Sequence, residues 1–250
     1  MWEPLFSLFF RHWPDCPYPV YLVANHQRCE HPRVQTLLAG DDKDWTSTLC
    51  AAIAQVPHSR VLFWIDDAFP DKPVVTQRVE SLVEDFNSAG MKFLRLRPDP
   101  RPSQWTPQGY GILDKVAAYR VTLFATLWER DTLQAILRPG ESAWQFEIDG
   151  TERSRDLDGF FATGEAVFSY QHGVERGIWI RPTAHALERQ GFALDYTRRP
   201  LMTPGQHLAY RFRQLKARVF HLIPERHRMG ALALVRRAYR MLGLRQAGTP

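Results

Sequence analysis

Apolar and polar positions in the first part of the chain predict a strand, a helix and a second strand. The run at 61–65 is apolar throughout and rich in β-branched and aromatic residues, which is typical of a strand buried on both faces. An earlier run at 19–24 predicts a core strand that ends at the polar Asn25. Between them, apolar residues recur at helical spacing from Trp45, and Asp44 is placed to cap that helix. This order favours a βαβ unit and a parallel sheet.

Later segments continue the mixture of helical and extended patterns. They predict helices over 75–86 and 181–191, a short strand at 92–96, helical spacing over 127–137 and a turn-rich β segment over 163–177. Four prolines at positions 98 to 107 predict a loop that cannot join the interior of a sheet, and its length suggests a mobile or ligand-covering segment. The pattern as a whole therefore predicts an α/β protein.

The C-terminal segment differs in composition from the rest of the chain. From Arg198 onward, eleven Arg and one Lys stand against a single acid, so this segment carries a formal charge of +11. Since the whole chain carries +5, the remainder carries −6. We expect a body over 1–200 and a basic amphipathic tail over 201–250, with helices at 207–222 and 228–244.

Three interpretations of this tail stay open. Residues 205–246 can lie on an anionic membrane surface with their apolar face inward. They can also form a helical hairpin that packs on the body and leaves its arginines in water. Nucleic acid is the weakest of the three partners, because the tail lacks an aromatic platform for stacked bases and any known base-reading motif.

Composition limits the remaining classes. The three cysteines, at positions 16, 29 and 50, have neither the number nor the spacing of a disulfide framework or a zinc site, and they suit a reducing cytoplasm. No apolar run reaches the roughly 18 residues that span a bilayer. The apolar stretch between Glu3 and Arg11 is too short and wrongly charged for a secretory signal. We predict a cytoplasmic protein, which would be peripheral at the inner membrane face under the first interpretation of the tail.

Asp66 and Asp67 are the first candidates for chemistry, because they end the apolar run at 61–65. Open α/β sheets bind ligands beyond the carboxyl ends of their strands. Two adjacent carboxylates repel each other, and a divalent cation, Mn²⁺ or Mg²⁺, is the simplest way to stabilise both in the charged form. Such a cation would offset charge on a leaving diphosphate. Alternatively, the two acids are solvated turn residues or a helix cap.

Other residues have the chemistry to complete such a site. Glu141 or Glu147 would accept the proton of an attacking hydroxyl, and Glu141 is favoured because the preceding Pro-Gly begins a new element. Each can instead be structural, as an acid favoured by a helix dipole or a surface acid. Arg95 and Arg120 would pair with phosphate oxygens, or alternatively with a structural carboxylate. Trp144 would stack on a sugar ring, or alternatively belong to the core.

Several motifs resemble those of one protein family. They are Asp66-Asp67-Ala68-Phe69; Arg95-Leu96-Arg97-Pro98-Asp99-Pro100; Tyr119-Arg120 followed by Leu123 and Trp128; Pro139-Gly140-Glu141-Ser142-Ala143-Trp144-Gln145-Phe146-Glu147; and a later Gly177-Ile178-Trp179. The pattern covers about residues 15–195 and resembles bacterial glycosyltransferases encoded with polysaccharide biosynthesis functions. The resemblance implies a GT-A-like fold, that is, a Rossmann-type mixed sheet flanked by helices, followed in this chain by the basic helical extension.

The resemblance also implies roles for particular residues. Asp66 and Asp67 would bind the metal and the sugar nucleotide, Glu141 would lie near the acceptor-side base, and Asn25 would lie near the nucleotide. The family's usual Asp-x-Asp signature is Asp-Asp-Ala in this chain. This difference leaves open which acid would bind the metal, which would contact the ribose or sugar, and whether a metal is needed. The expected function is transfer of a sugar from a nucleotide-diphosphate donor to a glycan or lipid-linked acceptor in surface polysaccharide synthesis.

Two rival functions use some of the same features. A nucleotidyltransferase has related chemistry, but it should carry a glycine-rich phosphate loop after the first strand, and residues 25–28 contain no glycine. A non-catalytic protein would instead bind its partner through the basic tail. A salt-dependent interaction with DNA, without stabilisation by any nucleotide sugar, would favour that second rival.

Overall fold

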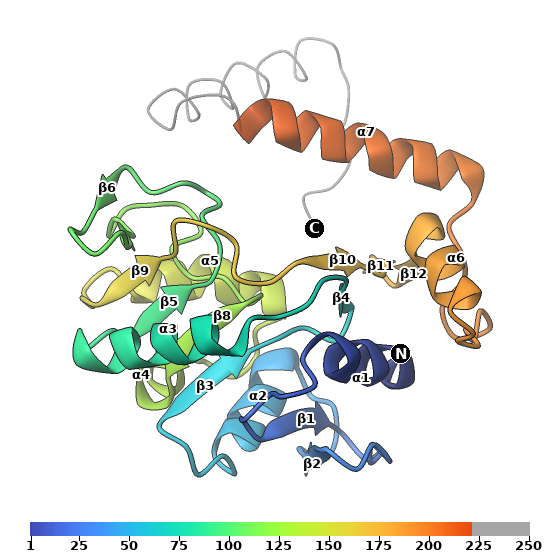
Figure 1. Ribbon diagram of the computed structural model, residues 1–250, viewed down its shortest axis with the longest axis horizontal. Helices are drawn as coiled ribbons and strands as arrows, with labels where there is room; N and C mark the ends of the chain where they lie inside the picture. The colour runs from blue at the N-terminus through green and yellow to red at the C-terminus, as the bar shows by residue number, and fades with distance from the viewer. Residues whose placement is uncertain (222–250) are drawn as a thin grey trace. The chain divides into compact units, whose positions relative to one another are not determined.

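The computed structural model of the chain describes residues 1–221 (Figure 1). The chain divides into two compact units, Met1–Pro200 and Leu201–Pro250. The described residues form a mixed α/β protein with seven helices and a six-stranded sheet, which confirms the predicted class. The helices are α1 (Trp2–His12), α2 (Trp45–Ile53), α3 (Thr76–Ser88), α4 (Arg130–Ile136), α5 (Ala143–Arg153), α6 (Arg181–Arg189) and α7 (Pro204–His221).

The six-stranded sheet has the strand order β3-β8-β5-β9-β7-β6. Only β5 and β9 are parallel neighbours in it, and the other pairs are antiparallel. Its strands are β3 (Arg60–Phe63), β5 (Phe93–Arg95), β6 (Gln104–Trp105), β7 (Gly111–Ile112), β8 (Thr126–Glu129) and β9 (Phe160–Ala162). Three strand pairs complete the set: β1 (Val20–Ala24) with β2 (Val34–Leu38), β4 (Ala68–Pro70) with β10 (Tyr170–His172), and β11 (Val174–Glu175) with β12 (Ile178–Trp179).

The predicted parallel βαβ unit is wrong. The strand expected at 61–65 is β3, which lies at one end of the strand order and pairs antiparallel with β8. All of its residues are only partly buried, so it is not covered on both faces. The strand expected at 19–24 is β1, whose parallel partner is β2. The pattern missed β2 because polar Gln35 and Thr36 interrupt its apolar residues.

The helical spacing over 127–137 belongs to two elements rather than one. Leu127 and Trp128 lie in β8, and α4 begins only at Arg130. Trp128 is fully buried and pairs across the sheet with Phe93, with their ring centroids 4.4 Å apart. A strand that runs directly into a helix places its apolar residues at spacings that imitate a longer helix.

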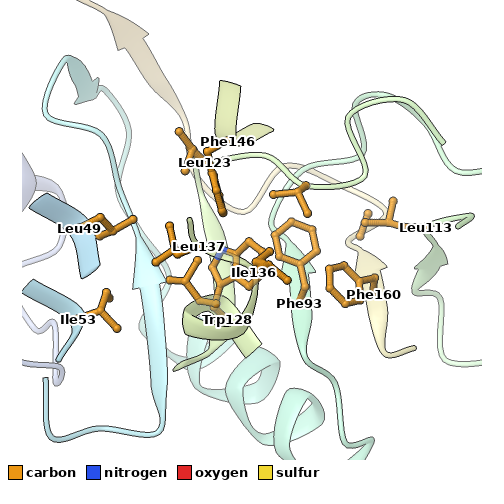
Figure 2. Close-up of a cluster of buried hydrophobic side chains, with 13 residues drawn as sticks. Leu49, Ile53, Phe93, Leu113, Leu123, Trp128, Ile136, Leu137, Phe146 and Phe160 are labelled. Atoms are coloured by element: carbon orange, nitrogen blue, oxygen red, sulfur yellow. The ribbon is translucent and has the colours of Figure 1, made fainter. Parts of the chain in front are cut away.

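Helices and strands share one core beside this sheet. Figure 2 shows Leu49 and Ile53 of α2 on one side of Trp128, and Phe93 and Phe160 on the other. All five side chains are buried. Burial of each such side chain stabilises the fold by about 1.5–3 kcal/mol, so this cluster holds α2 and the central strands together.

A loop over 120–125 is buried although it contains no helix or strand. Backbone groups in a buried loop need partners, and two side chains of α5 provide them. Thr151 Oγ1 accepts from the Val121 N–H at 3.1 Å, and a Glu147 carboxylate oxygen accepts from the Leu123 N–H at 2.9 Å. The loop and α5 therefore depend on each other.

Side-chain caps fix the starts of two helices that border the candidate residues. Asp44 caps α2, as predicted, and accepts from the Ser47 N–H at 2.7 Å and the Ser47 hydroxyl at 2.6 Å. These hydrogen bonds hold the pKa of Asp44 below its ordinary value. Ser142 and Gln145 form a capping box at the start of α5.

The second unit contains α7, which confirms the described part of the helix predicted at 207–222. The helix predicted at 228–244 lies outside the described residues. Within residues 1–221, no helix combines the length and hydropathy needed to cross a bilayer.

Candidate functional site

Asp66 and Asp67 form the turn between β3 and β4 (Figure 1). Hydrogen bonds close this turn: Trp64 Nε1 donates to the Ala68 carbonyl at 2.8 Å, and the Ala68 N–H donates to the Ile65 carbonyl at 3.3 Å. Asp66 is exposed, whereas Asp67 is partly buried. The acidic pair therefore has one side chain in water and one held against the protein.

Pairing between β4 and β10 holds the acidic turn in place. The Gly173 N–H donates to the Asp67 carbonyl at 2.7 Å, directly after the paired residues Ala68 and His172. A Cβ at Gly173 would lie 2.1 Å from the Phe69 ring and 3.1 Å from Trp179. Both aromatic rings are buried, so only glycine allows this close approach.

The carboxyl group of Asp67 is in surroundings that disfavour its charge. Its Oδ1 is buried and has no hydrogen-bond partner among the described residues. Desolvation, and then the negative charge of Asp66, raise the pKa of Asp67 to about 6. The charge of Arg199 opposes this shift, and that of Glu175 adds to it. Such a group is stabilised in its charged form by an added cation.

Arg97 is a second group with unused hydrogen-bonding capacity. Its Nε is buried without a partner among the described residues, while its Nη1 donates to the Tyr170 hydroxyl at 3.3 Å. The charge of Arg97 lowers the pKa of both Glu147 and His172, although it is not the main cause at either residue. Arg97 therefore connects α5 to the end of β10.

His172 links the arginine to the acidic turn. It pairs with Ala68, the neighbour of Asp67, and its ring lies beside that of Tyr170, with centroids 5.1 Å apart. Desolvation lowers the pKa of His172 although the residue is classed as exposed. Arg97 adds to that decrease, and Glu175 opposes it. The charge of Glu175 on β11 thus acts on both His172 and Asp67, and that of Arg97 acts on His172.

Glu147 lies on α5 and is also partly buried. Burial raises its pKa, and the N–H of Leu123 and the charge of Arg97 oppose that shift. Helical geometry places Trp144 beside both Glu147, three positions further on, and Ile148, four positions further on. Trp144 and Ile148 are 41% and 36% exposed, so an apolar surface open to water adjoins this carboxyl group.

Glu141 is committed to an ion pair. Its two carboxylate oxygens accept from Arg153 at 2.6 and 2.7 Å, and its backbone exchanges hydrogen bonds with Thr46 on α2. The Glu141 side chain is only 13% exposed and that of Arg153 is 23% exposed. This geometry favours a structural role at the start of α5, and the catalytic role of Glu141 stays a prediction.

Arg95 and Arg120 are both buried and donate to backbone carbonyls. Arg95 contacts the carbonyls of Arg97 and Pro100, and thereby holds the loop that follows β5. Arg120 donates to the carbonyls of Leu113, Ser154 and Leu157. Its guanidinium carbon also lies 4.1 Å from the centroid of the Phe160 ring. These contacts favour structural roles and leave little of either side chain for a phosphate.

Asn25 follows β1, and its Nδ2 donates to the Gly40 carbonyl at 2.9 Å. Gly40 follows β2, so this hydrogen bond ties together the carboxyl ends of two parallel strands. Such an end is where α/β proteins bind ligands, and Asn25 keeps one carboxamide oxygen for a ligand there. Its predicted role near a nucleotide stays a prediction.

The surface also has a pocket of about 390 Å³ away from the acidic turn. Ser103, Gln104, Asp114, Lys115 and Asp158 line it, together with Arg120. Lys115 and Asp158 pair with each other at 2.8 Å, and Arg120 donates to carbonyls, so the charged groups of this pocket are already satisfied. The unpartnered polar atoms of Asp67 and Arg97 lie elsewhere.

Sequence reasoning missed Arg97, Tyr170 and His172. Arg97 stands in the motif at 95–100, but Arg95 was the arginine that the pattern favoured. The available signal was that Arg97 follows the strand, whereas Arg95 lies within it and is drawn into the core. Tyr170 and His172 carried no signal, because their approach depends on the pairing of β10 with β4.

No group of three or more His, Cys, Asp or Glu side chains suited to a metal ion occurs in the described part of the chain. A metal at the acidic turn would therefore have at most the two carboxylates of Asp66 and Asp67 as nearby protein ligands. That number is ordinary for a magnesium or manganese ion that also binds substrate phosphates and water. The unpartnered Oδ1 of Asp67 fits such a cation.

Comparison with known proteins adds no relative to this description. No protein-family model, no curated protein and no solved structure matches the chain.

Proposed function

We propose that this chain is a glycosyltransferase that moves a sugar from a nucleotide-diphosphate donor to a glycan or lipid-linked acceptor in surface polysaccharide synthesis. The observation that carries the proposal is a pair of buried polar atoms without partners among the described residues, Asp67 Oδ1 and Arg97 Nε. The charge of Glu175 acts on both Asp67 and His172, and the charge of Arg97 acts on His172. Buried polar atoms of folded proteins normally have partners, so such atoms suggest a missing ligand. A cation with a diphosphate has the charges to satisfy both.

Asp67, assisted by Asp66, would hold a divalent cation, and Arg97 would donate to phosphate oxygens. The cation would offset the negative charge that develops on the departing diphosphate. A guanidinium is well shaped for phosphate oxygens, and the buried Nε of Arg97, which has no partner among the described residues, is a donor that a phosphate oxygen would satisfy. The exposed His172 would add a neutral ring beside the phosphates, since its pKa is lowered.

Glu147 is the better candidate for the base that accepts the acceptor's proton. A base works best when its pKa is brought toward the working pH, and burial raises the pKa of Glu147. Glu141 instead has both oxygens bound to Arg153. The exposed Trp144 on the same helix face would stack on a sugar ring next to that base.

Two further features support a GT-A-like arrangement. The carboxyl ends of the parallel strands β1 and β2 carry Asn25, which suits the nucleotide. The sheet strand β3 leads into the acidic turn, which suits the diphosphate and its metal. The motifs over about residues 15–195 that resemble those of bacterial glycosyltransferases also favour this proposal.

A thermal-shift panel tests this proposal. The panel would contain nucleotide diphosphates and their sugars, each with and without Mn²⁺. A ligand at 100 times its Kd stabilises the folded protein by about 2.7 kcal/mol, which raises Tm by several degrees. We expect at least one nucleotide to do so, and more strongly with Mn²⁺.

Two variants make the panel specific for the site. Arg97→Gln should lose most of the nucleotide-dependent shift, whereas Arg101→Gln should keep it, because Arg101 is exposed on the neighbouring loop. If no nucleotide stabilises the wild-type protein, or if Arg97→Gln responds as the wild type does, this proposal is wrong.

A further inference from the structure

Three apolar side chains of α7 form a stripe along the helix. Leu208, Phe212 and Leu215 are separated by four and three positions, which places them on one face. They are 69%, 70% and 58% exposed. Large apolar groups in a row are normally covered, so this stripe indicates an interaction surface.

The opposite face of α7 is the more covered one. His207 and Tyr210 are partly buried, although they are the more polar residues of this part of the helix. A helix that only packs on a protein core shows the reverse arrangement, with its leucines and phenylalanines buried. Among the described residues, the apolar stripe is therefore the exposed face of α7.

The charge of α7 points to the chemistry of the partner. The helix contains Arg211, Arg213, Lys216 and Arg218, and it has no Asp or Glu. Helical spacing places the exposed Arg211 at a border of the stripe. Basic residues that border an apolar stripe reach toward phosphate headgroups while the stripe enters the acyl region.

We propose that this face of α7 docks on an anionic lipid surface, with Leu208, Phe212 and Leu215 inserted among the lipids. Nucleic acid would pair with the basic residues of α7 through its phosphates but would leave the apolar side chains in water. A neutral protein groove would cover the apolar side chains but would not account for the basic residues of the helix. An anionic bilayer satisfies both features at once.

Vesicle co-sedimentation of the full chain tests this docking. We expect binding to phosphatidylcholine vesicles that contain about 30% phosphatidylglycerol, and at least roughly tenfold weaker binding to phosphatidylcholine alone. Binding should weaken as the salt concentration rises, since salt screens the basic residues. Equal binding to the two kinds of vesicle, or no binding to either, would overturn the proposal.

Substitutions separate the apolar contribution from the charge. Leu208→Gln with Phe212→Gln should weaken binding to anionic vesicles roughly tenfold or more, because both side chains lose their insertion into lipid. Arg211→Gln should weaken it roughly fivefold. Ala209→Gln is the matched control: it adds the same residue to an exposed position beside the stripe and should bind like the wild type.

The outcome for the double variant decides the partner. These apolar positions are exposed, so the variant should fold, which circular dichroism and thermal melting can verify. If it binds anionic vesicles as the wild type does, charge alone is responsible and the insertion is disproved. If the wild type is a dimer that the variant breaks, and neither binds vesicles, the stripe binds a second copy instead. Docking does not require the proposed catalytic activity. A negative thermal-shift panel would therefore refute only the proposed function, and a negative vesicle experiment would refute only the docking.

Discussion

Asp67, Arg97 and Glu147 are polar side chains that the fold keeps partly buried. Two of them hold atoms without a hydrogen-bond partner in the described residues, and burial raises the pKa of both carboxyl groups. Groups arranged in this way reduce the stability of the folded protein, and active sites commonly contain them. The loss of folding stability that each group causes can be measured separately from any enzymatic activity.

Substitution of Asp67 by Asn should stabilise the protein at neutral pH. The pKa of Asp67 rises from its ordinary 3.8 to about 6 on folding, so the folded state binds the proton more tightly and ionisation destabilises it. The wild type should lose stability as the pH rises from about 4 to 6, and Asn avoids this loss. After allowance for partial exposure, we expect a gain of about 1–2 kcal/mol at pH 7.5 and almost none at pH 4.

Denaturant unfolding at several pH values measures this difference. Asp66→Asn is the matched control, because Asp66 is exposed in the same turn and should show a smaller gain. If Asp67→Asn destabilises the protein equally at pH 4 and pH 7.5, the carboxyl group is not held against its charge.

Glu147→Gln should mainly reduce the rate of transfer, whereas Glu141→Gln should mainly reduce the stability of the fold. Glu147→Gln keeps an acceptor for the Leu123 N–H but cannot take a proton, so the transfer rate should fall by about 100- to 10,000-fold while donor binding persists. Glu141→Gln weakens a nearly buried ion pair and should cost about 1–3 kcal/mol of stability with little loss of rate per folded molecule. Single-turnover kinetics and thermal melting of both variants separate the roles. A fully active Glu147→Gln would refute this assignment of the base.

At the scale of elements, the strand pair β4–β10 brings the acidic turn to His172 and Tyr170 (Figure 1). The pair is short, and aromatic contacts extend it: Phe69 of β4 stacks on Trp179 of β12, with centroids 6.0 Å apart. Gly173 lies against both rings. The position of Asp67 therefore depends on a contact with a segment about one hundred residues further along the chain.

Gly173→Ala should damage this arrangement. The added Cβ would lie 2.1 Å from the Phe69 ring, and because that ring is buried it cannot swing into solvent. We expect a loss of about 1–3 kcal/mol in unfolding free energy, and weaker nucleotide binding because the turn moves. Gly164→Ala is the control, since its Cβ would meet its nearest neighbour at 3.6 Å. Equal stability of the two variants would contradict the tight contact.

Local signals predicted elements well and pairings poorly. The cap at Asp44 and the apolar spacing of α3 are properties of nearby residues, and each appears in the structure. The antiparallel pairing of β3 with β8 joins residues more than sixty positions apart, and nothing near residues 60–65 specifies it. The candidate site shows the same division, because Asp67 directly follows its strand whereas His172 reaches the acidic turn through the pairing of β10 with β4.

At the scale of the whole molecule, the chain separates an acidic body from a basic tail. Residues 1–197 carry −6 and the segment from Arg198 carries +11. Composition alone gives this separation of charge, whereas the pattern of apolar positions predicted the mixed α/β class. The exposed stripe on α7 could not be predicted in this way, since helical spacing shows that an apolar face exists and does not show whether it is covered.

Titration calorimetry tests the central claim, a cation-dependent diphosphate site at Asp67, most directly. The ligand is the nucleotide diphosphate that stabilises the protein most, with and without Mn²⁺, and the proteins are the wild type, Asp67→Asn and the exposed control Asp42→Asn. We predict that Mn²⁺ strengthens binding to the wild type and to the control. Because the metal competes with the proton that Asp67 binds below pH 6, affinity should also fall roughly tenfold at about pH 5. Asp67→Asn should lose the dependence on Mn²⁺, and an unchanged, Mn²⁺-dependent affinity in that variant would contradict the claim.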